Sequence, residues 1–287
     1  MAAVLILGAQ TLSAKWGQTP SEMPGGQTLA IVNAGVESAE DAPFVAPDYL
    51  FNPGDFVYLI FEISGYKVAG NGPRHISLKY KAEPLDSKGI PLAAAAAGTI
   101  EQEIGKEDKD WMPKRRASFL LPSYLAQGVY RINVTVEDLI AKSKKTKELS
   151  FNISGPKIEP GRGLEVQRFR FERSEQDGPG LDVAAYRPGD TVWARFDMTG
   201  FKTGQGNAVD VAYGITVFRP NGAQLFEQKS AAREKVNGEF YPPQFVPGIL
   251  SVTTTKDLSP GAYKLVVHVN DLLGKQTIDF EQSFRVE

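Results

Sequence analysis

Cysteine is absent from this 287-residue chain, and histidine occurs only twice. Without thiols the protein has no disulfide, no thiolate nucleophile and no cysteine-ligated metal. The two histidines, His75 and His268, are far apart in the sequence and are poor material for a metal or acid–base centre. The sequence therefore predicts no metal site and no other cofactor.

The chain also lacks an excess of charge of one sign. Its 32 basic and 34 acidic residues give a formal net charge of −2, without the basic footprint of proteins that bind nucleic acid or anionic membranes. No run reaches the roughly 20 apolar residues of a membrane span. Common hydrolase motifs such as HExxH and Gly-x-Ser-x-Gly are missing, so a protein that is not an enzyme is expected. An enzyme with an unrecognised acidic pair is the weakest alternative.

Amphipathic helical patterns are missing too, whereas alternation with period two is frequent. Residues 130–136 and 263–269 alternate between apolar and polar side chains. Each segment is therefore expected to be a strand with one buried face. Turn sequences ending in glycine, at 86–89 and 219–222, separate such strands. About seven strands per half predict an all-β fold of two tandem two-sheet sandwiches.

The two halves share one pattern. Residues 29–67 align with residues 164–202 without a gap, and the ends of the halves align after a change of register of two residues. Such self-similarity indicates an internal duplication. The recurring residues are Pro53, Gly54, Asp55, Tyr130 and Asp138 in the first half and Pro188, Gly189, Asp190, Tyr263 and Asp271 in the second.

The duplication predicts the domain organisation. Residues 155–163 contain three glycines and two prolines, which neither pair in a sheet nor extend a helix, so they are predicted to be a linker. We expect one sandwich at residues 27–154 and the other at residues 164–287.

Residues 1–26 are interpreted as a signal-like apolar segment and a lead into the first sandwich. The apolar run 1–8 is followed by small residues up to Ala14, as at the cleavage end of a secretory signal. No Lys or Arg precedes the run, which departs from that pattern, and a disordered or first-strand terminus is the alternative. The segment favours a secreted or periplasmic protein.

Two motifs carry a resemblance to a known family. Pro-Gly-Asp at 53–55 and at 188–190 leads into a strand. Leu-Pro-x-x-Leu-x-x-Gly-x-Tyr at 121–130 is echoed by Leu-x-x-Gly-x-Tyr at 258–263. The pattern resembles bacterial immunoglobulin-like and fibronectin-III-like modules, including the macroglobulin-type domains of secreted proteins. The resemblance implies a structural spacer or protein-interaction module with a partner in the cell envelope or extracellular space, and it implies no substrate.

The recurring polar residues are interpreted as structural. Asp55 and Asp190 are expected to cap the turns of their Pro-Gly-Asp motifs rather than to form a catalytic pair. A tyrosine after a glycine at a strand start, as at Tyr130 and Tyr263, resembles the tyrosine corner, in which the phenol bonds a turn backbone.

Asp138 and Asp271 follow strands and have polar neighbours. Together with Glu137 and Asn270 they could offer oxygen ligands to calcium, which requires about six to eight of them. No EF-hand or nonapeptide calcium spacing accompanies them. Solvated turn acids are the favoured interpretation.

Two segments break the repeat and could be specialised for binding. Residues 111–116 are basic beside an aromatic, and residues 240–245 are rich in aromatics and proline. Exposed aromatics serve peptide-binding and sugar-binding surfaces, which makes a carbohydrate-binding module an alternative function. The favoured alternative is that these side chains cover a sheet edge or pack between the domains. The candidate binding residues are Trp111, Trp193, Phe240, Tyr241 and Phe245.

Overall fold

The computed structural model describes residues 28–70, 73–105, 107–108, 111–159, 161, 163–176, 178–237 and 239–287. The signal-like segment predicted at residues 1–26 lies outside this set. The described residues form sixteen strands in four sheets and one 3-10 helix at Gln205–Asn207. This confirms the all-β fold. None of the described residues belongs to a helix long and apolar enough to cross a membrane.

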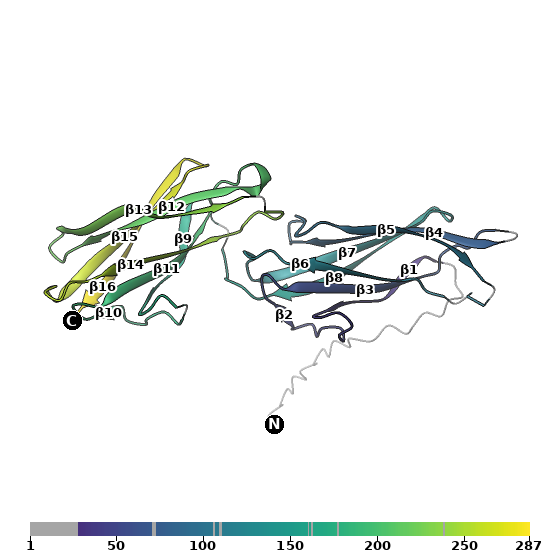
Figure 1. The fold of residues 1–287 in the computed structure, drawn as a ribbon, viewed down its shortest axis with the longest axis horizontal. Coiled ribbons are helices and arrows are strands. Elements are labelled where there is room, and N and C mark those ends of the chain that lie inside the picture. The colour runs from purple at the N-terminus through teal and green to yellow at the C-terminus, as the bar shows by residue number, and fades with distance from the viewer. Residues whose placement is uncertain are drawn as a thin grey trace, which may run out of the picture.

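The first sandwich packs a three-stranded sheet against a five-stranded sheet (Figure 1). The strand order is β1-β3-β6 in the small sheet and β2-β8-β7-β4-β5 in the large one. Neighbouring strands are antiparallel, except that β2 runs parallel to β8. The strands are β1 (Ala30–Glu37), β2 (Leu50–Phe51), β3 (Phe56–Ser64), β4 (Arg74–Leu85), β5 (Ala96–Ile104), β6 (Lys114–Leu120), β7 (Gly128–Asp138) and β8 (Ser143–Ile153).

The second sandwich has the same topology, strand for strand. Its sheets have the orders β9-β11-β14 and β10-β16-β15-β12-β13, and β10 again runs parallel to the last strand. The short strands β2 and β10 add one strand per unit to the expected seven, and two residues are too few to leave a periodic pattern. The strands are β9 (Glu165–Glu172), β10 (Ala185–Tyr186), β11 (Thr191–Thr199), β12 (Val209–Phe218), β13 (Gln224–Val236), β14 (Val246–Thr253), β15 (Gly261–Asp271) and β16 (Gln276–Val286).

The apolar faces predicted from alternation are buried. In β7 the inward residues are Tyr130, Ile132, Val134 and Val136, and their neighbours in sequence are half-exposed or exposed. Because each large apolar side chain contributes about 1.5–3 kcal/mol on burial, such faces are sufficient to hold two sheets together. The corresponding residues of β15 are Tyr263, Leu265, Val267 and Val269.

Each sandwich contains a tyrosine corner and a capped Pro-Gly-Asp turn. The Tyr130 hydroxyl donates to the carbonyl oxygen of Ala126 at 3.0 Å. The Asp55 carboxylate accepts a hydrogen bond from the backbone N–H of Asn52 at 2.7 Å. In the second sandwich the equivalent bonds join Tyr263 to Ser259 at 2.7 Å and Asp190 to Arg187 at 2.8 Å.

The expectation that Asp138 is a solvated turn acid is wrong. Its exposed fraction is 1%, and its carboxylate accepts three backbone hydrogen bonds. Ile140 and Ala141 donate to one oxygen at 2.9 and 2.8 Å, and Lys67 donates to the other at 2.6 Å. The carboxylate thus ties the β7–β8 turn to the segment after β3. Asp271 is equally buried and accepts hydrogen bonds from Leu273, Gly274 and Lys202.

Replacing Asp138 by alanine is expected to lower the free energy of unfolding by about 3 kcal/mol, because three backbone N–H donors lose a charged acceptor that is itself buried. Glu137→Ala is the matched control. Glu137 precedes Asp138 in β7 and pairs with Lys144 at the surface, so its loss is expected to cost less than about 1 kcal/mol. Urea denaturation of both variants measures the difference, and equal losses would contradict the structural role of Asp138.

Candidate functional site: the seam between the sandwiches

The segment between β13 and β14 leaves the second sandwich and enters the first. Tyr241, on this segment, is only 3% exposed and belongs to the buried apolar cluster of the first sandwich. Phe245, four residues later, is buried as well and meets the ring of Tyr124 edge-on, with ring centroids 5.9 Å apart. The apolar core of the first sandwich is therefore completed by a residue from the second half of the chain.

Polar contacts fix the orientation of the inserted ring. The Tyr241 hydroxyl donates to a carboxylate oxygen of Asp86 at 2.8 Å. The side-chain amide of Gln244 donates to the same hydroxyl at 2.6 Å, and its oxygen accepts from the backbone N–H of Ala126 at 2.9 Å. Tyr241 and Gln244 together therefore connect two separate loops of the first sandwich.

Asp86 is buried and serves two structural functions. One of its oxygens accepts the backbone N–H groups of Lys88 and Ile90, each at 2.8 Å, which closes the β4–β5 turn. The other oxygen faces Tyr241. Gly89 completes this turn with a φ of 84°, a conformation that other residues rarely adopt. In the second sandwich Arg219 occupies the aligned position, so the acceptor for a tyrosine is specific to the first sandwich.

The tyrosine corner of the first sandwich lies directly beside the seam, by which we mean the contact between the first sandwich and the segment that carries Tyr241, Gln244 and Phe245. Ala126 accepts the Tyr130 hydroxyl through its carbonyl oxygen and donates its N–H to Gln244. Burial raises the pKa of Tyr130 to about 12. Burial, and next the hydrogen bond to Asp86, raise the pKa of Tyr241. Both phenols are thus held protonated at neutral pH, and the Tyr241 hydroxyl can act as a donor to the Asp86 carboxylate.

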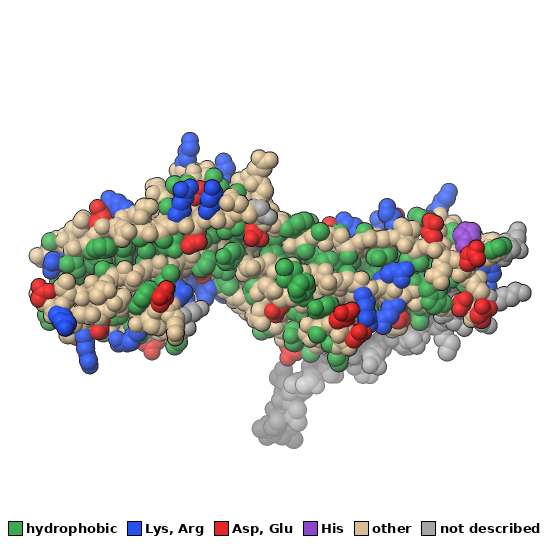
Figure 2. Space-filling view, viewed as in Figure 1, with side chains coloured by type: hydrophobic (Ala, Val, Ile, Leu, Met, Phe, Trp, Pro, Cys, Tyr) green, Lys and Arg blue, Asp and Glu red, His purple; other side chains and the backbone are tan. Residues whose placement is uncertain are grey.

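An open groove of about 580 Å³ runs along the seam. Residues of both sandwiches and of the segment between them line it, including Lys88, Val129, Glu159, Thr199 and Pro242. Figure 2 shows hydrophobic side chains continuing across the junction between the sandwiches. The charged residues in its lining are Asp86, Lys88 and Glu159. Within the described ranges, no cluster of three or more His, Asp or Glu side chains could hold a metal ion.

The five candidate aromatics do not lie on one surface. Tyr241 and Phe245 are buried at the seam, and Phe240 beside them is 56% exposed. Trp111 is half-buried at the start of β6, the end of that strand away from the seam, and its carbonyl oxygen accepts the Tyr66 hydroxyl. Trp193 is half-buried in β11 of the second sandwich. The structure thus brings together only the three aromatics of the 240–245 segment.

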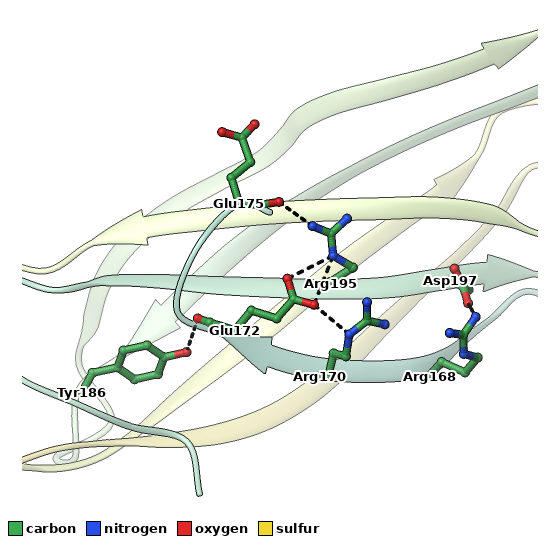
Figure 3. A network of polar contacts seen from close by, with 7 residues as sticks. All are labelled: Arg168, Arg170, Glu172, Glu175, Tyr186, Arg195 and Asp197. Atoms are coloured by element: carbon green, nitrogen blue, oxygen red, sulfur yellow. Dashed lines mark hydrogen bonds and ion pairs between the residues drawn. The ribbon is translucent and has the colours of Figure 1, made fainter. Parts of the chain in front are cut away.

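A network of charged residues on the second small sheet was not found from the sequence (Figure 3). The buried carboxylate of Glu172 accepts hydrogen bonds from Arg170 at 2.7 Å and from Arg195 at 3.0 Å. Arg195 also donates to the carbonyl oxygen of Glu175, and the Tyr186 hydroxyl donates to that of Glu172. The repeat alignment pairs Glu172 with Glu37, which is the one signal that could have marked this position.

The sequence matches no family model and no curated protein. Among solved structures, the C-terminal domain of the AgI/II polypeptide BspA from Streptococcus agalactiae aligns with 88% of this chain and 99% of its own, at 8% identity and a TM-score of 0.30. A family 123 glycoside hydrolase from Clostridium perfringens aligns with 43% of this chain and 27% of its own, at 10% identity and a TM-score of 0.30. At such scores neither likeness carries an argument about this chain.

The pKa of Tyr130 leads to a prediction for alkaline pH. A phenol whose pKa is raised from 10.0 to about 12 contributes stability that is fully present below pH 10 and is lost as the pH rises through 12. We expect Tyr130→Phe to remove this contribution, so that the free energy of unfolding falls less between pH 10 and 12 than in the wild type. Urea denaturation across this range measures the slope, and identical slopes would contradict the assignment.

Proposed function

We propose that the protein is a non-catalytic spacer in which two immunoglobulin-like sandwiches are held at a fixed mutual orientation and present surfaces to a protein partner. The observation that carries this proposal is the burial of Tyr241 of the second half inside the core of the first. A pair of modules joined only by a flexible segment would not need such a contact. The arrangement of two sheets with the strand order β1-β3-β6 opposite the remaining five supports the immunoglobulin-like assignment.

The energy of the joint supports a fixed orientation. Burial of one large aromatic side chain contributes about 1.5–3 kcal/mol. A hydrogen bond to a charged acceptor, such as that from Tyr241 to Asp86, adds about 1.5–3 kcal/mol. The chain between the sandwiches is attached as well, since Gln127 donates its N–H to the carbonyl oxygen of Pro156 at 3.0 Å. These contacts oppose free swivelling of the modules.

The state of four buried carboxylates supports a non-catalytic role. A general acid or base needs a carboxyl group that can reach a substrate. Asp86, Asp138 and Asp271 are buried and accept hydrogen bonds from turn backbones, and Glu172 is held between two arginines. The signal-like character of residues 1–26 supports export, with a partner in the cell envelope or the extracellular space.

Loosening the joint is the direct test of the spacer proposal. Tyr241→Ala is expected to broaden the distribution of distances between fluorophores placed on the two sandwiches, because the contact that orients them is lost. Phe240→Ala is the matched control, since this neighbouring ring is exposed and makes no buried contact with the first core. Single-molecule energy transfer, with small-angle scattering in support, measures the distribution. A Tyr241→Ala distribution as narrow as that of Phe240→Ala would refute the proposal.

The non-catalytic part of the proposal has a separate test. The purified wild-type chain is expected to show no turnover in a broad screen of glycosidase, esterase and peptidase substrates. Hydrolysis that is abolished by one carboxylate substitution would refute this part while leaving the joint intact.

A further inference from the structure

Glu37 and Glu172 occupy the same position in the two sandwiches. Each is the last residue of the first strand of its unit, β1 or β9, and each is paired with an aromatic of the next strand, Tyr58 or Trp193. Both are almost fully buried, with exposed fractions of 6% and 2%. The Glu37 oxygens still reach solvent, and a carboxylate with so little exposure is stabilised further by hydrogen-bond donors.

The donors present in the second sandwich are missing from the first. Glu172 is bonded by Arg170 and Arg195, whose aligned positions in the first sandwich hold Gly35 and Ile60. An arginine at position 35 would require the ring of Phe44 to move, because a Cβ there would lie 2.5 Å from it. Throughout the described part of the chain, no side chain or backbone group forms a hydrogen bond or ion pair with the Glu37 carboxylate.

Arg116 is the basic residue beside this carboxylate, and it is engaged elsewhere. It lies on β6 opposite Ile60, bonds the exposed Asp41, and comes within 4.0 Å of Glu40. Its pKa is raised first by the hydrogen bond to Asp41, and also by the charges of Asp41, Glu37 and Glu40. The site therefore keeps an excess of negative charge, with three carboxylates around one guanidinium group.

A pocket of about 190 Å³ opens beside Glu37. Glu37, Glu40 and Arg116 provide its charged wall, and Tyr58 provides an aromatic one. A guanidinium group fits this combination because it is planar, binds carboxylates through paired N–H groups and stacks on aromatic rings. An ammonium group offers neither the paired donors nor the flat face for stacking.

We propose that this pocket receives the side chain of an arginine from a protein partner, which supplies to Glu37 the guanidinium that Arg195 supplies to Glu172 within the second sandwich. The pocket lies on the outer face of the β1-β3-β6 sheet, and it uses none of the residues of the seam. The proposal therefore goes beyond the spacer role and stands or falls independently of it.

The test uses the full chain and three capped tripeptides that differ only in the central residue, which is arginine, lysine or citrulline. Each peptide is titrated into the labelled chain, and binding is followed by NMR through the chemical shifts of the backbone amides of β1, β3 and β6. We expect the arginine peptide to shift these signals and to bind at least about tenfold more tightly than the citrulline peptide, which keeps the shape of arginine without its charge. Equal shifts with arginine and citrulline would overturn the proposal, and tighter binding of the lysine peptide would overturn its choice of a guanidinium.

Two variants identify the carboxylate and exclude an internal partner. Glu37→Gln keeps the side-chain shape and is expected to weaken the arginine peptide about tenfold or more, whereas Glu101→Gln on the large sheet is the control without effect. Arg116→Gln is expected to strengthen binding, because it removes the only positive charge of the pocket. If the wild type binds no peptide and only Arg116→Gln does, Arg116 fills the pocket and the proposal is wrong. Should Glu37→Gln fail to fold, the contrast between arginine and citrulline on the wild type still decides.

Discussion

A carboxylate removed from water must be surrounded by hydrogen-bond donors, and this constraint organises the protein at several points. In the turns after β7 and β15, backbone N–H groups meet Asp138 and Asp271 and join those turns to a distant segment. At the seam, turn N–H groups and a phenol share Asp86. Glu37 is nearly buried and finds no donor within the described part of the chain, and it reaches solvent at the adjacent pocket.

The seam follows from the way in which Asp86 divides its two oxygens. Because one oxygen already closes the β4–β5 turn, the other is held in a fixed direction and can orient an incoming donor. Tyr241 satisfies it with a hydroxyl, and its ring fills the space left at the end of the first core. The stability of one sandwich and the orientation of the other are thereby coupled. A substitution that loosens the turn at Asp86 therefore also weakens the contact with Tyr241 that orients the second sandwich.

Sequence reasoning was most successful where the signal is local and periodic. The alternation in 130–136 gave the buried face of β7, and the glycine-tyrosine pair gave the corner at Tyr130. The prediction for Asp138 was wrong, because the alternation of a strand and the residues of its turn do not reveal that the segment after β3 packs over this turn. The insertion of Tyr241 was equally out of reach, since its segment has no period and its partner Asp86 lies 155 residues away in the sequence. The sequence did suggest that the aromatic segment 240–245 packs between the domains, but it did not reveal which residues Tyr241 contacts.

The two sandwiches show how one backbone position can be neutralised in different ways. In the second, the arginine that reaches the buried glutamate comes from β11, at Arg195, and Ile249 faces it on β14. In the first the same two positions are exchanged, with Ile60 on β3 and Arg116 on β6. The exchange preserves the charge and the volume of the pair but moves the guanidinium to the neighbouring strand, where Asp41 takes it. The carboxylate of Glu37 is left beside a pocket, so the divergence of the two units accounts for the site at which we propose that an arginine binds.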